Sequence, residues 1–575
     1  MFERLLRALQ TRTGPLWLAA LGFGLSLPAL GLGFVADDRV HAFVVTQRPL
    51  ETSLFRLTPE DAAADRFNGW LAWWSSPNLS VDFFRPLSSW THRLEYRLWP
   101  DAAWAMHLTN VVLYALLVLV AARLYREFMP GEGRSAALAG LLFAIDEGHA
   151  ASAGWISGRN TVLASLFALT ALLLHVRSRA GGSRALLHAA SAACVALALL
   201  CAEAGIAALA YLIAYALVFE PAGAGHWRRR LLSLAPQLGV IAIWAIWYLH
   251  GGYGARGTSF YRDLAHPGFV LREGLLDLPV WLFGMFGPGM ISAAIAQPAA
   301  PVRALALLLV SPLLAAMVLG TPRTRLNLFF ALGALGSLPT LFATQPQERL
   351  LLCASLGSCG LVASFIAAAA GHAQRFLRVS GMTMIAFHLV LAPFLFLASL
   401  PQARPFENGT RAILAALPAT LPTQVILVNT PVELLSMYTW AMLHYAHPNG
   451  IPLQSVHQLY SGNSDLLVKR IDPNTLEVRP RNGWGALPVE RIFGALYDLP
   501  RAGSELDCES IHVSVQENDA EGHPTRVQFR FPTPLESTDR LWLSWRGKKP
   551  VPWHPPPLGR ELVIPGLNLL SALEP

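Results

Sequence analysis

Apolar segments long enough to cross the roughly 30 Å hydrocarbon core of a bilayer recur along the chain and stop near Leu400. Short loops of polar and charged residues separate most of these segments. The pattern predicts an all-α membrane bundle over residues 1–400 and a domain of another kind after it. We expect about eleven transmembrane helices, at residues 16–35, 104–122, 136–150, 160–176, 186–202, 204–220, 231–249, 302–320, 326–343, 350–370 and 379–399.

Basic residues gather at one set of ends of these segments. Because Lys and Arg favour cytoplasmic loops, those ends are expected in the cytoplasm. This orientation predicts a multi-pass protein of an inner or plasma membrane, with a cytoplasmic N-terminus and an extracytoplasmic C-terminal domain. The basic residues are Arg4, Arg7, Arg12, Arg123, Arg126, Arg134, Arg177, Arg179, Arg184, Arg228, Arg229, Arg230, Arg323, Arg325, Arg375 and Arg378.

The segment 268–297 is apolar enough to span, yet it contains Gly284, Gly287, Pro288 and Gly289. If it crossed the membrane, the later basic ends would face outward. We therefore expect it to be an interfacial or re-entrant segment on the outer side.

An outer loop of residues 36–103 separates the first two spans. Aromatic residues at such density usually mark the membrane interface, so we expect short helices lying flat on the outer leaflet, with the loop folded against the bundle. Its aromatic residues include Trp70, Trp73, Trp74, Phe83, Phe84, Trp90 and Trp99, and Trp104 follows at the start of the second span.

After residue 400 the pattern changes to alternation, which predicts strands at 424–429, 511–516, 526–531 and 540–545. A helix is expected at 431–446, and a hairpin joins 466–471 to 476–479 through Asp472, Pro473 and Asn474. Residues 401–575 are thus predicted to form a soluble α+β or β-rich domain. Its first part, residues 401–418, contains three prolines and is expected to be a partly extended linker. We find no phosphate-binding loop and no Cys or His metal spacing in this domain.

Composition agrees with a membrane protein. With 53% hydrophobic residues, 14% charged residues and a mean hydropathy of +0.41, the 575 residues offer too little polar surface for a soluble globule of this size. The net charge of +7 follows from the basic cytoplasmic ends and gives no support to nucleic-acid binding. Five cysteines are too few for a disulfide scaffold and show no metal or redox spacing.

Ionisable residues at the outer helix ends are the strongest candidates for chemistry, because charges at membrane depth are costly. Asp37 and Asp38 follow the first span and could supply a general base or hold a cation, or could simply end the helix. Arg85, within the sequence FFRPL, is suited to a lipid phosphate, or could be a snorkelling or cation-π arginine.

The second group lies after the third span. Asp146, Glu147, His149 and Arg159 fall within about fourteen residues, a density that packing does not readily explain. Three more candidates could equally be capping or paired structural charges. They are Glu203, Glu348 and Arg349.

These motifs resemble those of polytopic GT-C glycosyltransferases, and more closely the protein O-mannosyltransferase-like or TMTC-like branch. The resemblance covers most of residues 15–400 and rests on VADDRV, FFRPL and FAIDEGHAASAGWISGRNTVLASLF. In the last motif four residues match the branch, and Asp146, Glu147 and Ala151 replace its usual His, Pro and Glu. LLCAEAGIA keeps the Glu of a Lys-Glu pair as Glu203, and QPQERLLL resembles an outer Glu-Arg pair. The four matching residues are His149, Trp155, Gly158 and Arg159.

The resemblance implies an inverting transferase that moves a sugar from a polyprenyl-phosphate donor to a hydroxyl of a protein, lipid or glycan on the outer face. Asp37, or less readily Asp38, would be the general base. The arginines would stabilise the leaving phosphate, and the remaining polar residues would orient substrate or hold an optional Mg²⁺ or Mn²⁺. The arginines are Arg85, Arg159 and Arg349, and the polar residues are Asp146, Glu147, His149, Glu203 and Glu348.

Three other functions remain open. A transporter or flippase would carry charges at mid-membrane and show internal symmetry, neither of which we find. A polymerase or ligase of surface polysaccharide usually has its large loop late in the chain, whereas the large loop here lies between the first two spans. An inactive scaffold of the same fold is the third alternative.

Overall fold

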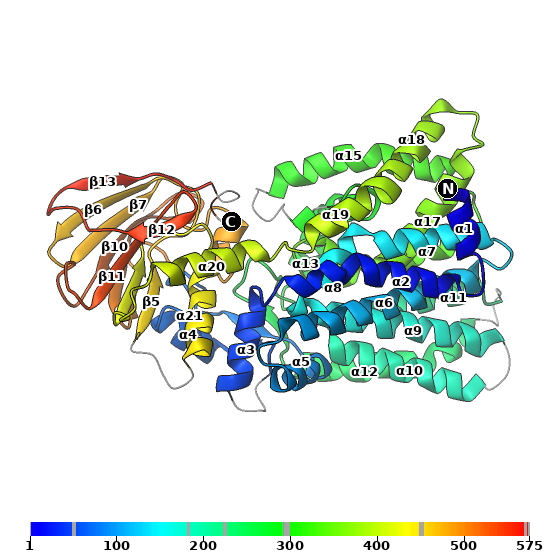
Figure 1. Ribbon diagram of the computed structural model, residues 1–575, viewed down its shortest axis with the longest axis horizontal. Coiled ribbons are helices and arrows are strands. Elements are labelled where there is room, and N and C mark those ends of the chain that lie inside the picture. Colours follow the sequence, from blue (N-terminus) through cyan, green and yellow to red (C-terminus); the bar gives the residue numbers. More distant parts are fainter. Residues whose placement is uncertain are drawn as a thin grey trace.

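The computed structural model describes residues 2–48, 53–180, 184–221, 227–289, 291–292, 299–447, 453–568 and 572. A helical bundle lies beside a β-rich domain, and helices α3 (Asp37–Gln47), α20 (Arg404–Ala416) and α21 (Leu435–Ala446) lie between them (Figure 1). The chain is an integral multi-pass membrane protein with a membrane all-α bundle and a C-terminal β-rich region, as the sequence predicts.

A helix lies at each predicted span. Among the described residues, six helical stretches are long and apolar enough to cross a membrane: Gly14–Gly31, Ala103–Phe128, Ile156–Arg179, Trp227–His250, Ala299–Gly320 and Arg375–Ala416. The helices that make up the bundle are α1 (Phe2–Leu9), α2 (Gly14–Ser26), α6 (Ala103–Phe128), α7 (Gly133–Ile145), α8 (Ala150–Gly154), α9 (Arg159–Ala180), α10 (Arg184–Cys201), α11 (Ala207–Val218), α12 (Trp227–His250), α15 (Ala299–Gly320), α16 (Arg325–Ser337), α17 (Ala354–Ala369), α18 (Arg375–Ile385) and α19 (Ala392–Ser399).

The segment expected to be interfacial or re-entrant forms two short helices, α13 (Pro267–Leu276) and α14 (Leu278–Phe286). A helix of ten residues is only about 15 Å long, so neither helix alone crosses a bilayer. Residues 290 and 293–298 of the predicted segment lie outside the described residues.

Helix α5 (Pro86–Leu98) of the outer loop is amphipathic with its polar side inward. Ser88, His92 and Glu95 are buried against the protein, whereas Trp90 and Leu94, four residues apart, are exposed. An exposed apolar stripe on a helix beside a membrane bundle is the pattern of an interfacial helix. The short helix α4 (Pro59–Phe67) lies farther out, against the β-rich domain.

The expectation that the tryptophans of the outer loop mark the membrane interface is wrong for the central pair. Trp73 and Trp74 are 3% and 0% exposed and belong to the core of the β-rich domain. Their indole nitrogens donate to the carbonyl oxygens of Leu459 (3.2 Å) and Glu490 (3.1 Å). A high density of tryptophans does not distinguish residues at the membrane interface from residues in the core of another domain. Both environments favour a large ring with one polar atom.

The β-rich domain has two packed sheets with helices on one side. An antiparallel sheet has the strand order β13-β6-β7-β10-β9-β8, and a second sheet has the order β12-β11-β4-β5, in which β11, β4 and β5 are parallel. Apolar residues of both sheets share one core, and α20 and α21 pack on the outer face of the second sheet. The strands are β4 (Gln424–Leu427), β5 (Ser455–Gln458), β6 (Leu466–Asp472), β7 (Thr475–Pro480), β8 (Glu505–Cys508), β9 (Ile511–Asn518), β10 (Pro524–Arg530), β11 (Arg540–Arg546), β12 (Lys549–Pro552) and β13 (Glu561–Ile564).

The linker predicted as partly extended is instead largely helix α20. Pro405 stands in its first turn, where the missing N–H costs no hydrogen bond. Ile413 is buried and Phe406 partly buried against the second sheet and α21. The prolines that suggested an extended linker therefore mark the start of a helix and the residues after its end.

A small sheet joins the outer loop to a later one. Strand β2 (Ser80–Asp82) pairs with β1 (Arg56–Leu57) on one side and with β3 (Gly254–Arg256) on the other. The loop after α12 is thereby held close to the segment that carries Arg85.

Candidate functional site

The acidic pair stands at the start of α3, directly after a strained residue. Ala36 has φ +49° and ψ −124°, and it is the one non-glycine residue with positive φ in the described part of the chain. A side chain in this region costs of order 1–3 kcal/mol and persists only where the surroundings fix it. Here the strain turns the chain sharply from the end of the first span into α3, which sets the direction of both carboxylates.

Asp38 is fully buried and its carboxylate is fully engaged. Oδ2 accepts from the Val35 N–H (3.0 Å), and Oδ1 accepts from the N–H (2.9 Å) and hydroxyl (2.6 Å) of Ser157. Burial raises the pKa of Asp38 to about 7, against the lowering by these donors. With no oxygen left open to a substrate, Asp38 is suited to holding α3 against the turn 156–158.

Asp37 is only half-buried and holds a single side-chain hydrogen bond, from the hydroxyl of Tyr438 on α21 (2.8 Å). Burial raises the pKa of Asp37, while the Tyr438 hydrogen bond and the positive charge of Arg349 lower it. A carboxylate with a raised pKa and a free oxygen can accept a proton from a substrate hydroxyl.

Arg85 is held in place by a carboxylate and by aromatic rings. Its Nε and Nη2 both donate to Oε2 of Glu203, at 2.8 and 2.6 Å, and Tyr248 donates to the other oxygen of Glu203 at 3.3 Å. The guanidinium carbon lies 4.2 Å from the centre of the Phe83 ring. A cation fixed this firmly loses little entropy on binding an anion.

Arg349 is the second cation of the site. Its Nε donates to the side chain of Gln347 (2.6 Å), and its guanidinium carbon lies 5.1 Å from the centre of the Trp155 ring. It forms no ion pair with a described residue, and its electrostatic neighbours are Tyr261, Asp37, Arg85 and Glu348. The fold thus brings Asp37, Arg85, Glu203 and Arg349 into one electrostatic neighbourhood from four distant segments.

Arg159 is fully buried in the bundle and is held by other partners. It pairs with Glu95 (2.5 Å) and donates to the side-chain oxygen of Asn110 (2.6 Å) and the carbonyl of Met106 (3.1 Å). These contacts join α5, α6 and α9, so the arrangement favours a structural cation over a phosphate ligand.

The predicted polar residues after the third span form a neighbouring buried cluster. His149 is fully buried, with Nδ1 3.2 Å from the Tyr114 hydroxyl and Nε2 3.7 Å from Oδ2 of Asp146. Glu348 accepts from the N–H and hydroxyl of Ser292, and Glu147 lies against Gly289. The turn Glu348–Leu350 therefore contributes Arg349 to the group around Asp37 and Glu348 to this buried cluster.

The metal site predicted at Asp146 and Glu147 is not tested by the structure. Among the described residues, no set of three ligand atoms within 4.8 Å of one another includes Asp146 or Glu147. The predicted Mg²⁺ or Mn²⁺ site remains a prediction, and no step below depends on it.

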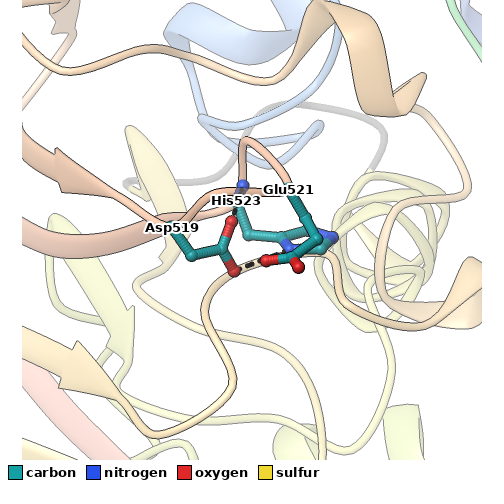
Figure 2. Close-up of side chains that lie close together, drawn as sticks. All are labelled: Asp519, Glu521 and His523. Carbon is teal, nitrogen blue, oxygen red and sulfur yellow. Dashed lines mark hydrogen bonds and ion pairs between the residues drawn. The ribbon is translucent and has the colours of Figure 1, made fainter.

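One such set does occur in the described residues, at the tip of the β9–β10 hairpin. Figure 2 shows Asp519, Glu521 and His523 there, with the His523 ring 2.9 Å from Oδ2 of Asp519. Asp519 also accepts from the His523 N–H (2.8 Å), so the bonds within the cluster close the turn. The spacing of these three residues is that of an ordinary polar turn, so the sequence alone does not predict a metal site here.

Sequence reasoning missed the residues that support the candidates. Tyr438 comes from the outer domain, 401 positions from Asp37, and no local pattern links the two. Ser157 and Trp155 lie inside the motif that carries His149 and Arg159. Their position in that motif could have drawn attention to them, but the sequence does not indicate that Ser157 bonds to Asp38 or that Trp155 contacts Arg349. Tyr261, which packs on Phe83 with ring centres 5.0 Å apart, lies in a loop for which the sequence predicted no functional residue.

No protein-family model matches the chain. The human protein O-mannosyl-transferase TMTC3 is 31% identical over 139 residues, which are 23% of this chain and 15% of that protein. The mouse protein O-mannosyl-transferase TMTC2 is 29% identical over 159 residues, which are 28% of this chain and 18% of that protein. The resemblance to TMTC proteins is confirmed. The TMTC-like match spans less than a fifth of those relatives.

Solved structures were also found to be similar. ArnT from Cupriavidus metallidurans bound to undecaprenyl phosphate gives a TM-score of 0.39 at 12% identity, over 78% of this chain and 90% of that one. The oligosaccharyltransferase of Archaeoglobus fulgidus, in complex with Zn and sulfate, gives 0.40 at 12% identity, over 75% of this chain and 61% of that one. With TM-scores below 0.5, these likenesses place no element or residue of this chain.

Proposed function

We propose that this protein is an inverting membrane glycosyltransferase that moves a sugar from a polyprenyl-phosphate donor to a hydroxyl of a protein, lipid or glycan on the outer face of the membrane. One observation carries the proposal: the half-buried Asp37 carboxylate shares an electrostatic neighbourhood with two immobilised cations, Arg85 and Arg349. The names of the TMTC relatives, protein O-mannosyl-transferases, support the same chemistry.

The reaction follows from the charges. Asp37 accepts the proton of the acceptor hydroxyl as its oxygen attacks the anomeric carbon. The bond between that carbon and the phosphate oxygen breaks, and the lipid phosphate leaves with the electron pair. Attack from the face opposite the phosphate inverts the anomeric centre.

The two arginines stabilise the leaving phosphate. Charge develops on the phosphate oxygens in the transition state, and fixed cations stabilise that charge without reorganising. Arg349, which has no ion-pair partner among the described residues, contacts the phosphate most directly, and Arg85 adds a second cation whose position Glu203 fixes.

The interfacial helix α5 indicates how the donor reaches the site. Its exposed Trp90 and Leu94 support a position of this helix at the membrane boundary, and Arg85 immediately precedes its N-terminus. A lipid-linked donor would then keep its chain in the bilayer with its phosphate at Arg85. This requires the outer loop and the C-terminal domain to lie outside the cytoplasm, as the basic residues predict.

The test is sugar transfer by the purified protein in lipid nanodiscs, supplied with polyprenyl-phosphate mannose, glucose or arabinose and acceptor hydroxyls. We expect Asp37→Asn to lower turnover by about 10²–10⁴-fold, because it removes the base but keeps the size of the side chain. Glu60→Gln is the matched control, since Glu60 is an exposed carboxylate of the same outer loop.

Equal turnover by Asp37→Asn and wild type would remove Asp37 as the base. No transfer by wild type from any of the three donors would favour the inactive scaffold, and movement of intact donor across the bilayer of sealed vesicles that contain the protein would favour a flippase.

A further inference from the structure

We propose that the outer domain completes the active site through Tyr438, a positioning residue that orients the Asp37 carboxylate and sets the pH range over which it can accept a proton. The inference rests on the proposed function, and it assigns a role to a domain whose own sequence names no chemistry.

The Tyr438 hydroxyl reaches Asp37 across a domain boundary. It donates to Oδ1 of Asp37 at 2.8 Å, and it is the one described side chain hydrogen-bonded to that carboxylate. The other oxygen of Asp37 is thereby left to a substrate. The bond also fixes which oxygen points outward, because a carboxylate held by one donor cannot turn freely.

The Tyr438 ring is itself immobilised. It is buried in an apolar cluster that includes Val35 and Ala36 of the membrane part and Ala403 and Met437 of the outer part. The centre of the ring lies 6.1 Å from that of Phe406 on α20, nearly perpendicular to it. The hydroxyl therefore cannot follow Asp37 if the carboxylate moves, so the bond acts as a fixed reference point.

Other contacts hold α20 and α21 against the membrane part. Arg39 of α3 lies 3.4 Å from Glu407 of α20, and the Tyr445 hydroxyl of α21 donates to the carbonyl of Pro100 (2.8 Å) and to Asp101 (3.1 Å). The Tyr438–Asp37 bond is thus one of several ties between the two parts. It differs from the others in ending on the proposed base.

The charged and titratable groups around Asp37 come from three elements. Arg349 of the turn 348–350 favours the charged form of Asp37, and Tyr438 of α21 favours it by donating a hydrogen bond. The charge of Asp37 in turn raises the pKa of its neighbour Asp38 on α3. Loss of the Tyr438 hydroxyl therefore stabilises protonated Asp37. Since a general base works only when deprotonated, activity is then lost at a higher pH than in the wild type.

The experiment compares Tyr438→Phe with Tyr445→Phe, a matched control on the same helix and at the same boundary. In the nanodisc assay we expect the acid-side midpoint of the kcat profile to rise by about one pH unit in Tyr438→Phe, the usual effect of one hydrogen bond to a charged group. Tyr445→Phe is expected to keep the wild-type midpoint.

A second readout does not depend on turnover. Infrared titration, as the difference between wild type and Asp37→Asn, follows the protonation of this carboxyl directly, and its midpoint should rise in Tyr438→Phe. Replacing Tyr438 by 3-fluorotyrosine, a stronger donor, should move both midpoints down. This variant also keeps the test decisive if Tyr438→Phe folds poorly.

The inference is overturned if the infrared midpoint stays unchanged in Tyr438→Phe, or if Tyr445→Phe shifts it equally. Failure of the proposed function has a different signature: the wild type would then transfer sugar from none of the three donors, while the infrared titration would still report whether Tyr438 controls the carboxyl.

Discussion

The two acidic residues at the start of α3, Asp37 and Asp38, have different environments. Neighbouring residues on a helix point roughly 100° apart, so Asp37 and Asp38 cannot face the same way. Asp38 turns inward to Ser157 and Val35, and Asp37 turns toward Tyr438. The sequence could indicate that the pair mattered but not which acid was available, because that depends on the direction in which the chain leaves Ala36.

Ala36→Gly tests the strain that sets this direction. Glycine adopts positive φ without steric cost, although the substitution also removes one buried methyl group. On balance we expect the variant to be more stable by about 1 kcal/mol and therefore to unfold at a higher temperature. Ala42→Gly, a buried alanine within α3, is the control and should destabilise by about 1 kcal/mol. Thermal melting in detergent, followed by tryptophan fluorescence, measures both. A destabilised Ala36→Gly protein would show that the backbone there is not strained.

Several secondary-structure elements of the outer domain were predicted at the right residues. The strands β4, β9, β10 and β11, the β6–β7 hairpin and helix α21 all fall there. Alternation and turn residues marked β9 and the hairpin, whereas β4, which is buried at every position, was marked by its apolar run. Short strands such as β5 and β8, and helix α20, were missed because four residues or a proline-rich start carry too little pattern. The sequence did not indicate which part of the protein packs on a given buried face. The tryptophans of the outer loop indicated that they would be buried, but not whether lipid or another domain would bury them.

Trp73→Ala tests whether the outer loop is part of the outer domain's core. The Trp73 ring has the rings of Trp74, Trp484 and Phe529 within 5.7 Å, centre to centre. Truncating a buried aromatic residue costs about 3–5 kcal/mol. We expect hydrogen exchange in β4, β5 and β7 to speed up accordingly. Trp90→Ala is the matched control, since Trp90 is 72% exposed, and it should leave exchange in those strands unchanged. Equal effects of the two substitutions would contradict the burial of Trp73.

At the scale of the whole molecule, the candidate site lies where three parts of the chain meet. The bundle supplies Arg349 and Glu203, the outer loop supplies Asp37 and Arg85, and the outer domain supplies Tyr438. The sequence motifs identified the first two parts because they resemble TMTC proteins, and they gave no sign of the third. Docking of the outer domain is therefore expected to be a condition for activity, and groups buried at its boundary affect the site indirectly.

Glu433 is such a group, and it predicts a pH dependence of the docked state. It is buried between β4 and α21, accepts from the Phe493 N–H (3.2 Å) and lies beside Ser75 of the outer loop. Burial raises the pKa of Glu433 from 4.5 to about 8, and the charge of Arg491 offsets this only in part. Folding thus favours the protonated carboxyl. The stabilisation is fully present below about pH 4.5 and is lost as the pH rises through about 8.

We therefore expect the thermal midpoint of the outer domain to fall between pH 6 and pH 9 in the wild type, and to fall distinctly less in Glu433→Gln, which keeps a neutral side chain at every pH. Some slope should remain in the variant, because burial also raises the pKa of Glu490 to about 7. Glu521→Gln, at an exposed carboxylate of the same domain, should retain the wild-type slope. Parallel curves for Glu433→Gln and wild type would show that Glu433 does not titrate with folding, and that the pH sensitivity of the boundary originates elsewhere.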